Sequence, residues 1–194
     1  MINFFPYYKG REIMKKILST LSILLIMTGC SLTDMDNTPT KQVETYLNNY
    51  QTLDSNVLTE LDSIVNDEEL FDEDQKTTYR DILKKHYQDL TYMVKEETVN
   101  GDRATVEVEI EVTDYTKALK EAEAYKTTNE SDLLDDNGVF DDVKFNTYKL
   151  DLLKSSKDRV KYTIYFSLTK TNDKWILDQL TNTEQEKLLG IYEY

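Results

Sequence analysis

The chain has 194 residues, of which 37 are acidic and 23 basic, and its formal net charge at pH 7 is -14. This charge disfavours a nucleic-acid-binding protein, because affinity for phosphates needs a basic face. One cysteine and one histidine exclude an intramolecular disulfide, a multi-cysteine zinc site and every metal motif with two histidines. The five glycines form no phosphate loop, so the sequence predicts no cofactor and no metal.

Residues 1–29 have the organisation of a secretory signal peptide. Lys15 and Lys16 precede an uncharged apolar run, Ile17 to Met27, which ends in small residues. This order is typical of exported proteins. The run is shorter than the roughly 20 residues of a membrane-spanning helix, so export is favoured over spanning. Met14, directly before the two lysines, fits such a signal better than Met1 as the start.

Met27-Thr28-Gly29-Cys30 resembles the bacterial lipobox, in which cleavage precedes a cysteine that carries diacylglycerol. The resemblance implies a lipoprotein on the extracytoplasmic face of the cell membrane, attached through acyl chains such as palmitate on Cys30. An ordinary signal with an incidental cysteine is the alternative. The only cysteine of the chain lies where the lipobox requires one, which favours lipidation. Residues 30–38, polar and without periodicity, are then predicted to be a tether.

Three amphipathic helices are expected at the start of a single domain that spans residues 39–194. Thr38 and Pro39 supply an N-cap and a first-turn proline, and apolar residues follow at helical spacing. Asp54 or Ser55 can cap the second helix. The third helix is expected from about residue 74 to residue 89, with Asp74 as its cap.

After these helices the hydrophobic period changes to that of a strand. A weak strand near residues 92–96 leads to Asn100-Gly101, which predicts a type I′ hairpin turn with both residues at its centre. Residues 104–112 and 160–168 alternate strictly between apolar and polar. A turn at 171–174 and a strand at 175–180 complete an antiparallel sheet with one face in water.

An insertion, residues 114–158, separates the second strand from the third. Its apolar spacing predicts one helix near residues 115–125 and another near 145–153. The pattern Thr181-x-x-Glu184 predicts a short terminal helix with a capping box. The sequence therefore predicts an α+β fold, in which N-terminal helices pack on a curved, cone-like antiparallel sheet with a helical insertion between strands.

The order of these elements is similar to that of nuclear-transport-factor-two-like lipoproteins. The segments that carry the resemblance are Asn100-Gly101-Asp102-Arg103-Ala104-Thr105-Val106 and Thr171-Asn172-Asp173-Lys174-Trp175-Ile176-Leu177, after the lipobox and the Thr-Pro helix start. The resemblance covers Thr38 to about Leu180 and breaks at the insertion. It implies a curved sheet wrapped on helices around a pocket that is filled, empty or catalytic, and fold alone delivers no activity.

His86 is the one candidate catalytic residue, because its ordinary pKa lies nearest to neutrality. The resemblance allows a histidine on the helices to face the pocket. However, His86 shares its helical face with Ile82, Leu83 and Leu90, which favours a packed histidine over a general base.

Two acidic segments could suggest a calcium site. For the first segment, a solvated junction between helices is favoured over a calcium site. Its residues are Asp67, Glu68, Glu69, Asp72, Glu73 and Asp74. In the second segment, alignment of Gly138 with the invariant glycine of a calcium loop puts Leu133 at the first ligand and Lys144 at the last, so that interpretation fails.

The hypothesis favoured by these observations is a lipid-anchored extracytoplasmic binding or interaction module rather than an enzyme. Its expected partners are the membrane, through Cys30, and a protein or small molecule outside the cell, and the many tyrosines suit either a contact surface or a half-buried sheet. The first alternative is a small pocket isomerase or hydrolase of the same fold that uses His86. A second alternative is a signal peptide that is itself the active product.

Overall fold

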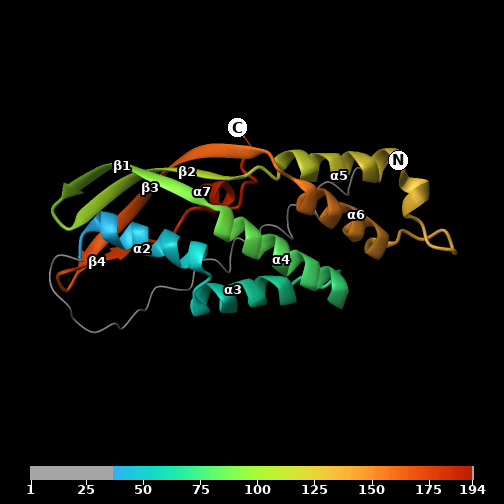
Figure 1. Cartoon of the computed structure of the whole chain (residues 1–194), viewed down its shortest axis with the longest axis horizontal. Helices are drawn as coiled ribbons and strands as arrows, with labels where there is room; N and C mark the ends of the chain where they lie inside the picture. Colours follow the sequence, from blue (N-terminus) through green and yellow to red (C-terminus); the bar gives the residue numbers. More distant parts are fainter. Residues whose placement is uncertain (1–36, 194) are drawn as a thin grey trace, which may run out of the picture.

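The computed structural model describes residues 37–193 (Figure 1). The predicted signal peptide, residues 1–29, and Cys30 lie outside the described residues, as does most of the predicted tether. The described elements in chain order are α2 (Pro39–Thr52), α3 (Ser55–Asn66), α4 (Glu73–Asp89), β1 (Thr91–Asn100), β2 (Arg103–Thr113), α5 (Thr116–Thr128), the 3₁₀ helix η2 (Glu130–Leu133), α6 (Asp142–Ser155), β3 (Arg159–Thr171), β4 (Lys174–Leu177) and α7 (Asn182–Leu188). They confirm the predicted α+β class, with N-terminal helices packed on a curved antiparallel sheet.

The sheet has the strand order β1-β2-β3-β4, and every neighbouring pair is antiparallel. Apolar and polar residues alternate along β2 and β3, and this alternation decides which side chains face inward. Val106 pairs with Phe166 and Val108 pairs with Ile164, and all four are buried. Side chains of α2 and α7 join these strands in one apolar cluster, so this face of the sheet and the helices that cover it form the main core.

The other face of the sheet carries charge, as the alternation predicts. Glu107, Glu109 and Glu111 form a row on β2, and Lys161 on β3 lies 3.3 Å from Glu109 and 3.8 Å from Glu111. Lys95 on β1 lies 3.4 Å from Glu109. Solvent-exposed pairs of this kind contribute little to stability, so the row mainly keeps this face polar.

The hairpin between β1 and β2 forms where it is predicted, but its central residues are shifted by one. Asn100 is the last paired residue of β1, so the turn is built on Gly101 and Asp102 and the expected Asn100-Gly101 centre is wrong. Of these two, only Gly101 has a positive φ, 62°, as in a type II′ turn. The type I′ pattern occurs between β3 and β4 instead, where Asn172 and Asp173 both have positive φ.

Side-chain caps fix where the first three described helices begin. The Thr38 hydroxyl and the Asp54 carboxylate accept amide hydrogen bonds at the starts of α2 and α3, as predicted. The expected cap of the third helix, Asp74, is wrong. Asp72 caps α4 instead, because it forms a capping box with Gln75, three residues later. The Asp72 carboxylate accepts from the Gln75 backbone amide, and the Gln75 side-chain carbonyl accepts from the Asp72 backbone amide. Asp74 lies in the first turn, where its negative charge interacts favourably with the helix dipole.

The helices α5, η2 and α6 lie between β2 and β3, within the predicted insertion at residues 114–158. They have a small core of their own, in which Ala122, Leu133 and Phe145 are buried. The Gln75 side chain of α4 donates a 2.8 Å hydrogen bond to the Val143 carbonyl of α6. The insertion therefore packs on α4 and extends beyond the end of the sheet (Figure 1).

The last strand, β4, ends at Leu177 and is therefore shorter than the expected strand at residues 175–180. Its Trp175 is half-buried against the main core. The chain then leaves the sheet and reaches Thr181, which forms the predicted capping box with Glu184 at the start of α7.

Asn37, the first described residue, binds the turn between β3 and β4. Its side-chain amide donates to the Asp173 carbonyl at 2.6 Å, and its side-chain carbonyl accepts from the Trp175 amide at 3.0 Å. The chain therefore enters the domain at the end of the sheet where the β3–β4 turn lies (Figure 1). We call this pair of hydrogen bonds the Asn37 clamp.

The segment after α7 passes so close to β2 that it requires a glycine. Gly190 has a φ of 66°, and a Cβ atom there would lie 2.0 Å from the Thr113 carbonyl oxygen. The Tyr115 amide donates a 2.9 Å hydrogen bond to the Gly190 carbonyl, which holds the two segments together. Any side chain at this position would force them apart.

Gly190→Ala should lower the free energy of unfolding by about 3 kcal/mol or more, since it adds a backbone clash to left-handed strain. Gly101→Ala is the matched control, because Gly101 has a similar φ of 62° but no atom within 4 Å of the place that an added methyl group would occupy. It should lose only about 1–2 kcal/mol. Urea denaturation of both variants gives the comparison, and equal losses would contradict the close approach.

Candidate functional site

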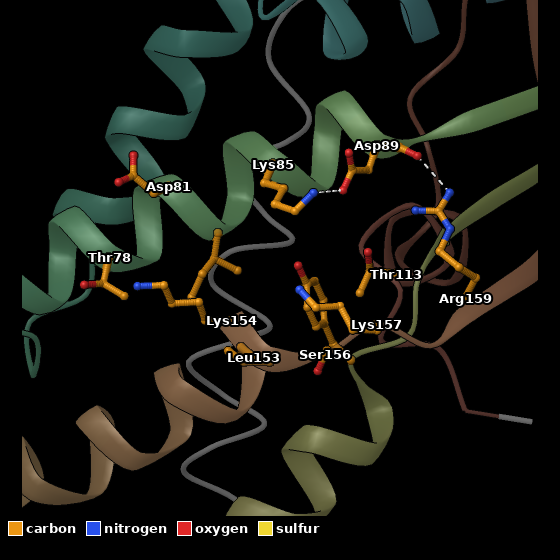
Figure 2. A pocket seen from close by; sticks show the side chains of 12 residues that line it. Thr78, Asp81, Lys85, Asp89, Thr113, Leu153, Lys154, Ser156, Lys157 and Arg159 are labelled. Carbon is orange, nitrogen blue, oxygen red and sulfur yellow. Dashed lines mark hydrogen bonds and ion pairs between the residues drawn. The ribbon is translucent and has the colours of Figure 1, made fainter.

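A pocket of about 290 Å³ opens between α4, the C-terminal end of α6 and the ends of β2 and β3 (Figure 2). This volume is near the lower limit for sites that bind small molecules. Its lining residues are Thr78, Asp81, Ile82, Lys85, Asp89, Thr113, Tyr115, Leu153, Lys154, Ser156, Lys157 and Arg159.

The strand register places this pocket far from the Asn37 clamp. Thr113 and Arg159, which line the pocket, are partners at one end of the β2–β3 pair. At the other end Arg103 pairs with Thr169, close to the β3–β4 turn that Asn37 binds. From Arg103 to Thr113, the first and last residues of β2, the strand spans about 33 Å at ~3.3 Å per step. The pocket and the entry of the chain therefore lie at opposite ends of the sheet.

Two of the pocket's cations have partners in the protein. Lys85 forms an ion pair with Asp89 at the end of α4. The Arg159 guanidinium donates to the backbone carbonyls of Asp89 and Glu111, at 2.8 and 2.7 Å. Figure 2 shows the bond to Asp89. These contacts tie the end of α4 to the sheet and fix one wall of the pocket.

The two other cations are Lys154, in the last turn of α6, and Lys157, in the link to β3. Both are exposed, and neither makes an ion pair with a residue in the described range 37–193. The buried side chains of Ile82, Tyr115 and Leu153 supply the apolar part of the lining. Burial raises the pKa of Tyr115 to about 12, so its hydroxyl keeps its proton at neutral pH.

His86 does not line this pocket. Its side chain is 1% exposed, and its Nε2 lies 2.8 Å from the Leu188 carbonyl oxygen. Burial lowers its pKa to about 4, so the imidazole is neutral at pH 7. A general base must reach the proton that it removes, and His86 is enclosed by the core. Its placement gives no support to the pocket-enzyme alternative.

A second buried titratable group, Glu60, was not singled out from the sequence. Its carboxylate accepts from the Tyr50 hydroxyl at 3.5 Å, and the Tyr50 hydroxyl itself accepts from Tyr46 at 3.4 Å. Burial raises the pKa of Glu60 to about 7. Helical spacing could have indicated it, because Glu60 follows Val57 by three residues and precedes Ile64 by four, which places it on the apolar face of α3.

The acidic segments do not converge on a cation site. Within residues 37–193, no three histidine, cysteine or acidic side chains are grouped as a metal ion would need. Asp72 is engaged as a helix cap, and Glu68 is buried. In the loop before α6, the Asp135 carboxylate accepts the amides of Asn137 and Val139, both at 2.8 Å, and so closes a tight turn.

The tyrosines are divided between the core and the surface. Tyr162 is buried in the sheet and donates to the Tyr192 carbonyl at 3.0 Å. Tyr165, on the charged face of the same strand, is 54% exposed. Among the residues that line the pocket, Tyr115 is the one tyrosine.

The burial of His86 and Glu60 predicts two opposite dependences of stability on pH. In the unfolded chain their pKa values are 6.5 and 4.5, and in the folded chain about 4 and about 7. The contribution of His86 is full above about pH 6.5 and is lost as the pH falls toward 4. That of Glu60 is full below about pH 4.5 and is lost as the pH rises through 7. Each amounts to roughly 3 kcal/mol, so they largely cancel.

Neutral variants should separate the two dependences. When the pH falls from about 7.5 to about 4.5, Glu60→Gln should lose roughly 3 kcal/mol relative to the parent protein, because only the His86 effect remains. His86→Gln should gain a similar amount over the same range. Urea denaturation at several pH values measures both. Parallel curves for the two variants would show that these groups do not titrate as buried groups.

Comparison with known proteins identifies one feature of the chain. Residues 14–31 match the prokaryotic membrane lipoprotein lipid attachment site. No curated protein matches the sequence. A similar solved structure is that of YcdA from Bacillus subtilis, described as a candidate lipoprotein, with 16% identity and a TM-score of 0.41; the similarity covers 92% of this chain and 56% of YcdA.

The chain thus spans little more than half of the YcdA structure. None of the helices in residues 37–193 is both long enough and apolar enough to cross a membrane. The attachment-site match supports a bacterial lipoprotein that is held at a membrane by its lipid anchor.

Proposed function

We propose that this lipoprotein is an extracytoplasmic binding module that presents the pocket between α4 and α6 to a ligand outside the cell. The observation that carries the proposal is that the entry of the chain and the pocket lie at opposite ends of the sheet. The chain reaches the described domain at the Asn37 clamp, and the pocket opens at the other end of β2, a strand about 33 Å long.

Cys30 is the residue to which we assign the lipid. Cleavage before it removes residues 1–29. The predicted tether, residues 30–38, is then shorter by two residues, because Asn37 and Thr38 are held by the domain. From Cys30 to Asn37 the chain can reach at most about 25 Å at ~3.6 Å per residue. Acyl chains on Cys30, palmitate among them, would fix the protein firmly, since several chains on one residue anchor stably. The acidic body is repelled by anionic lipids, which favours a domain that stands off the membrane.

The resemblance to the nuclear-transport-factor-two-like family belongs to this proposal, with residues 39–194 as one domain. Helices followed by an antiparallel sheet, with an insertion between β2 and β3, support it. The pocket differs from the expectation, because it lies at the end of the sheet and is completed by α6 of the insertion. In this protein the insertion therefore supplies part of the binding site.

Cys30→Ser should abolish fatty-acid labelling and move the protein from the membrane fraction to the medium, or leave it as an unprocessed precursor. The physical reason is that the acyl chains supply the membrane affinity, at about 0.8 kcal/mol for each buried methylene. Ser31→Ala is the control next to it and should be labelled normally. Unchanged labelling of Cys30→Ser would overturn the assignment of the anchor.

A further inference from the structure

The pocket has a charge opposite to that of the protein around it. In the whole chain, acidic residues outnumber basic ones by 37 to 23. Among the residues that line the pocket the balance is reversed, since Lys85, Lys154, Lys157 and Arg159 face only two carboxylates. A cleft with one sign of charge and low-dielectric walls concentrates ligands of the other sign.

The protein itself leaves two of these cations without a counter-ion. Lys85 neutralises Asp89, and Arg159 is engaged with the end of β2. Lys154 and Lys157 have no ion-pair partner in the described part of the chain. In Figure 2 the remaining carboxylate, Asp81, points away from both of them. An anion in the pocket would therefore meet the ammonium group of Lys154 or that of Lys157 with little competition from the protein.

One part of the lining is suited to an apolar group. Ile82, Leu153 and Tyr115 line the pocket, and each is exposed by less than a tenth. A bare inorganic ion would leave this surface in contact with water. A ligand with an apolar body would cover it and gain roughly 25 cal/mol for each Å² of apolar surface removed from water.

Resting on the proposed function, we infer that the pocket binds a small organic anion, with its charged group beside Lys154 or Lys157 and its apolar body on Ile82, Leu153 and Tyr115. The volume of about 290 Å³ limits the ligand to a small molecule. The proposal assigns binding and not turnover.

Benzoate is a suitable probe, because benzamide has nearly the same shape without the charge, and inorganic phosphate has charge without the apolar ring. Titration of the full lipoprotein in nanodiscs of zwitterionic lipid, followed by calorimetry, gives the three affinities. Benzoate should bind at least about fivefold more tightly than benzamide, as expected for a charge-assisted contact. It should also bind more tightly than phosphate, and its affinity should fall as salt is added.

The double variant Lys154→Gln/Lys157→Gln should weaken benzoate binding by about tenfold and leave benzamide unchanged. Lys120→Gln/Lys174→Gln is the matched control, with the same loss of charge at two exposed lysines outside the pocket, and it should bind benzoate as the parent does. Equal melting temperatures verify that both variants fold.

Three results would overturn the inference. They are equal affinity for benzoate and benzamide, insensitivity of benzoate binding to the pocket lysines, and binding of none of the probes. The first two leave a pocket that binds apolar molecules and so leave the proposed function standing. Fatty-acid labelling that persists in Cys30→Ser is a separate result, because it would overturn the anchor on which the proposed function rests without changing the three affinities.

Discussion

The pairing of β2 with β3 supports most of the other contacts in the molecule. Because side chains alternate between the two faces, a slip of one residue would move Val106 and Ile164 into water and bring Glu109 into the core. The same register sets both ends of the molecule. One end carries the β3–β4 turn and the Asn37 clamp, and the other carries the Thr113–Arg159 pair from which the pocket is built.

The helices on the buried face include polar groups that an apolar core would not need. His86 is held neutral beneath the loop that follows α7, and Glu60 lies among tyrosines between α2 and α3. Buried polar groups with incomplete hydrogen bonding cost stability. Neither lines the pocket, and both contribute to how the helices pack. The pocket instead takes its character from exposed lysines, whose placement depends on where α6 ends.

Local patterns in the sequence account for most of the fold. Strict alternation predicts β2 and β3, and Thr38, Asp54 and Thr181 predict three helix starts, because each of these signals acts over only a few residues. The errors are also local. The capping box moves the start of α4 from Asp74 to Asp72, and the hairpin register moves the first turn by one residue. The pocket could not be predicted, since it needs the insertion to fold back on α4, a long-range contact without a periodic signal.

The Asn37 clamp also determines how the domain would bear a mechanical load. A force transmitted from the lipid anchor enters the described chain at Asn37, next to the start of α2. It is met first by two hydrogen bonds from a single side chain, to the Asp173 carbonyl and from the Trp175 amide. The load then passes to α2 and the short strand β4, at the end of the sheet remote from α6. Tension would therefore loosen the anchored end of the molecule first, while the walls of the pocket stay outside the path of the force.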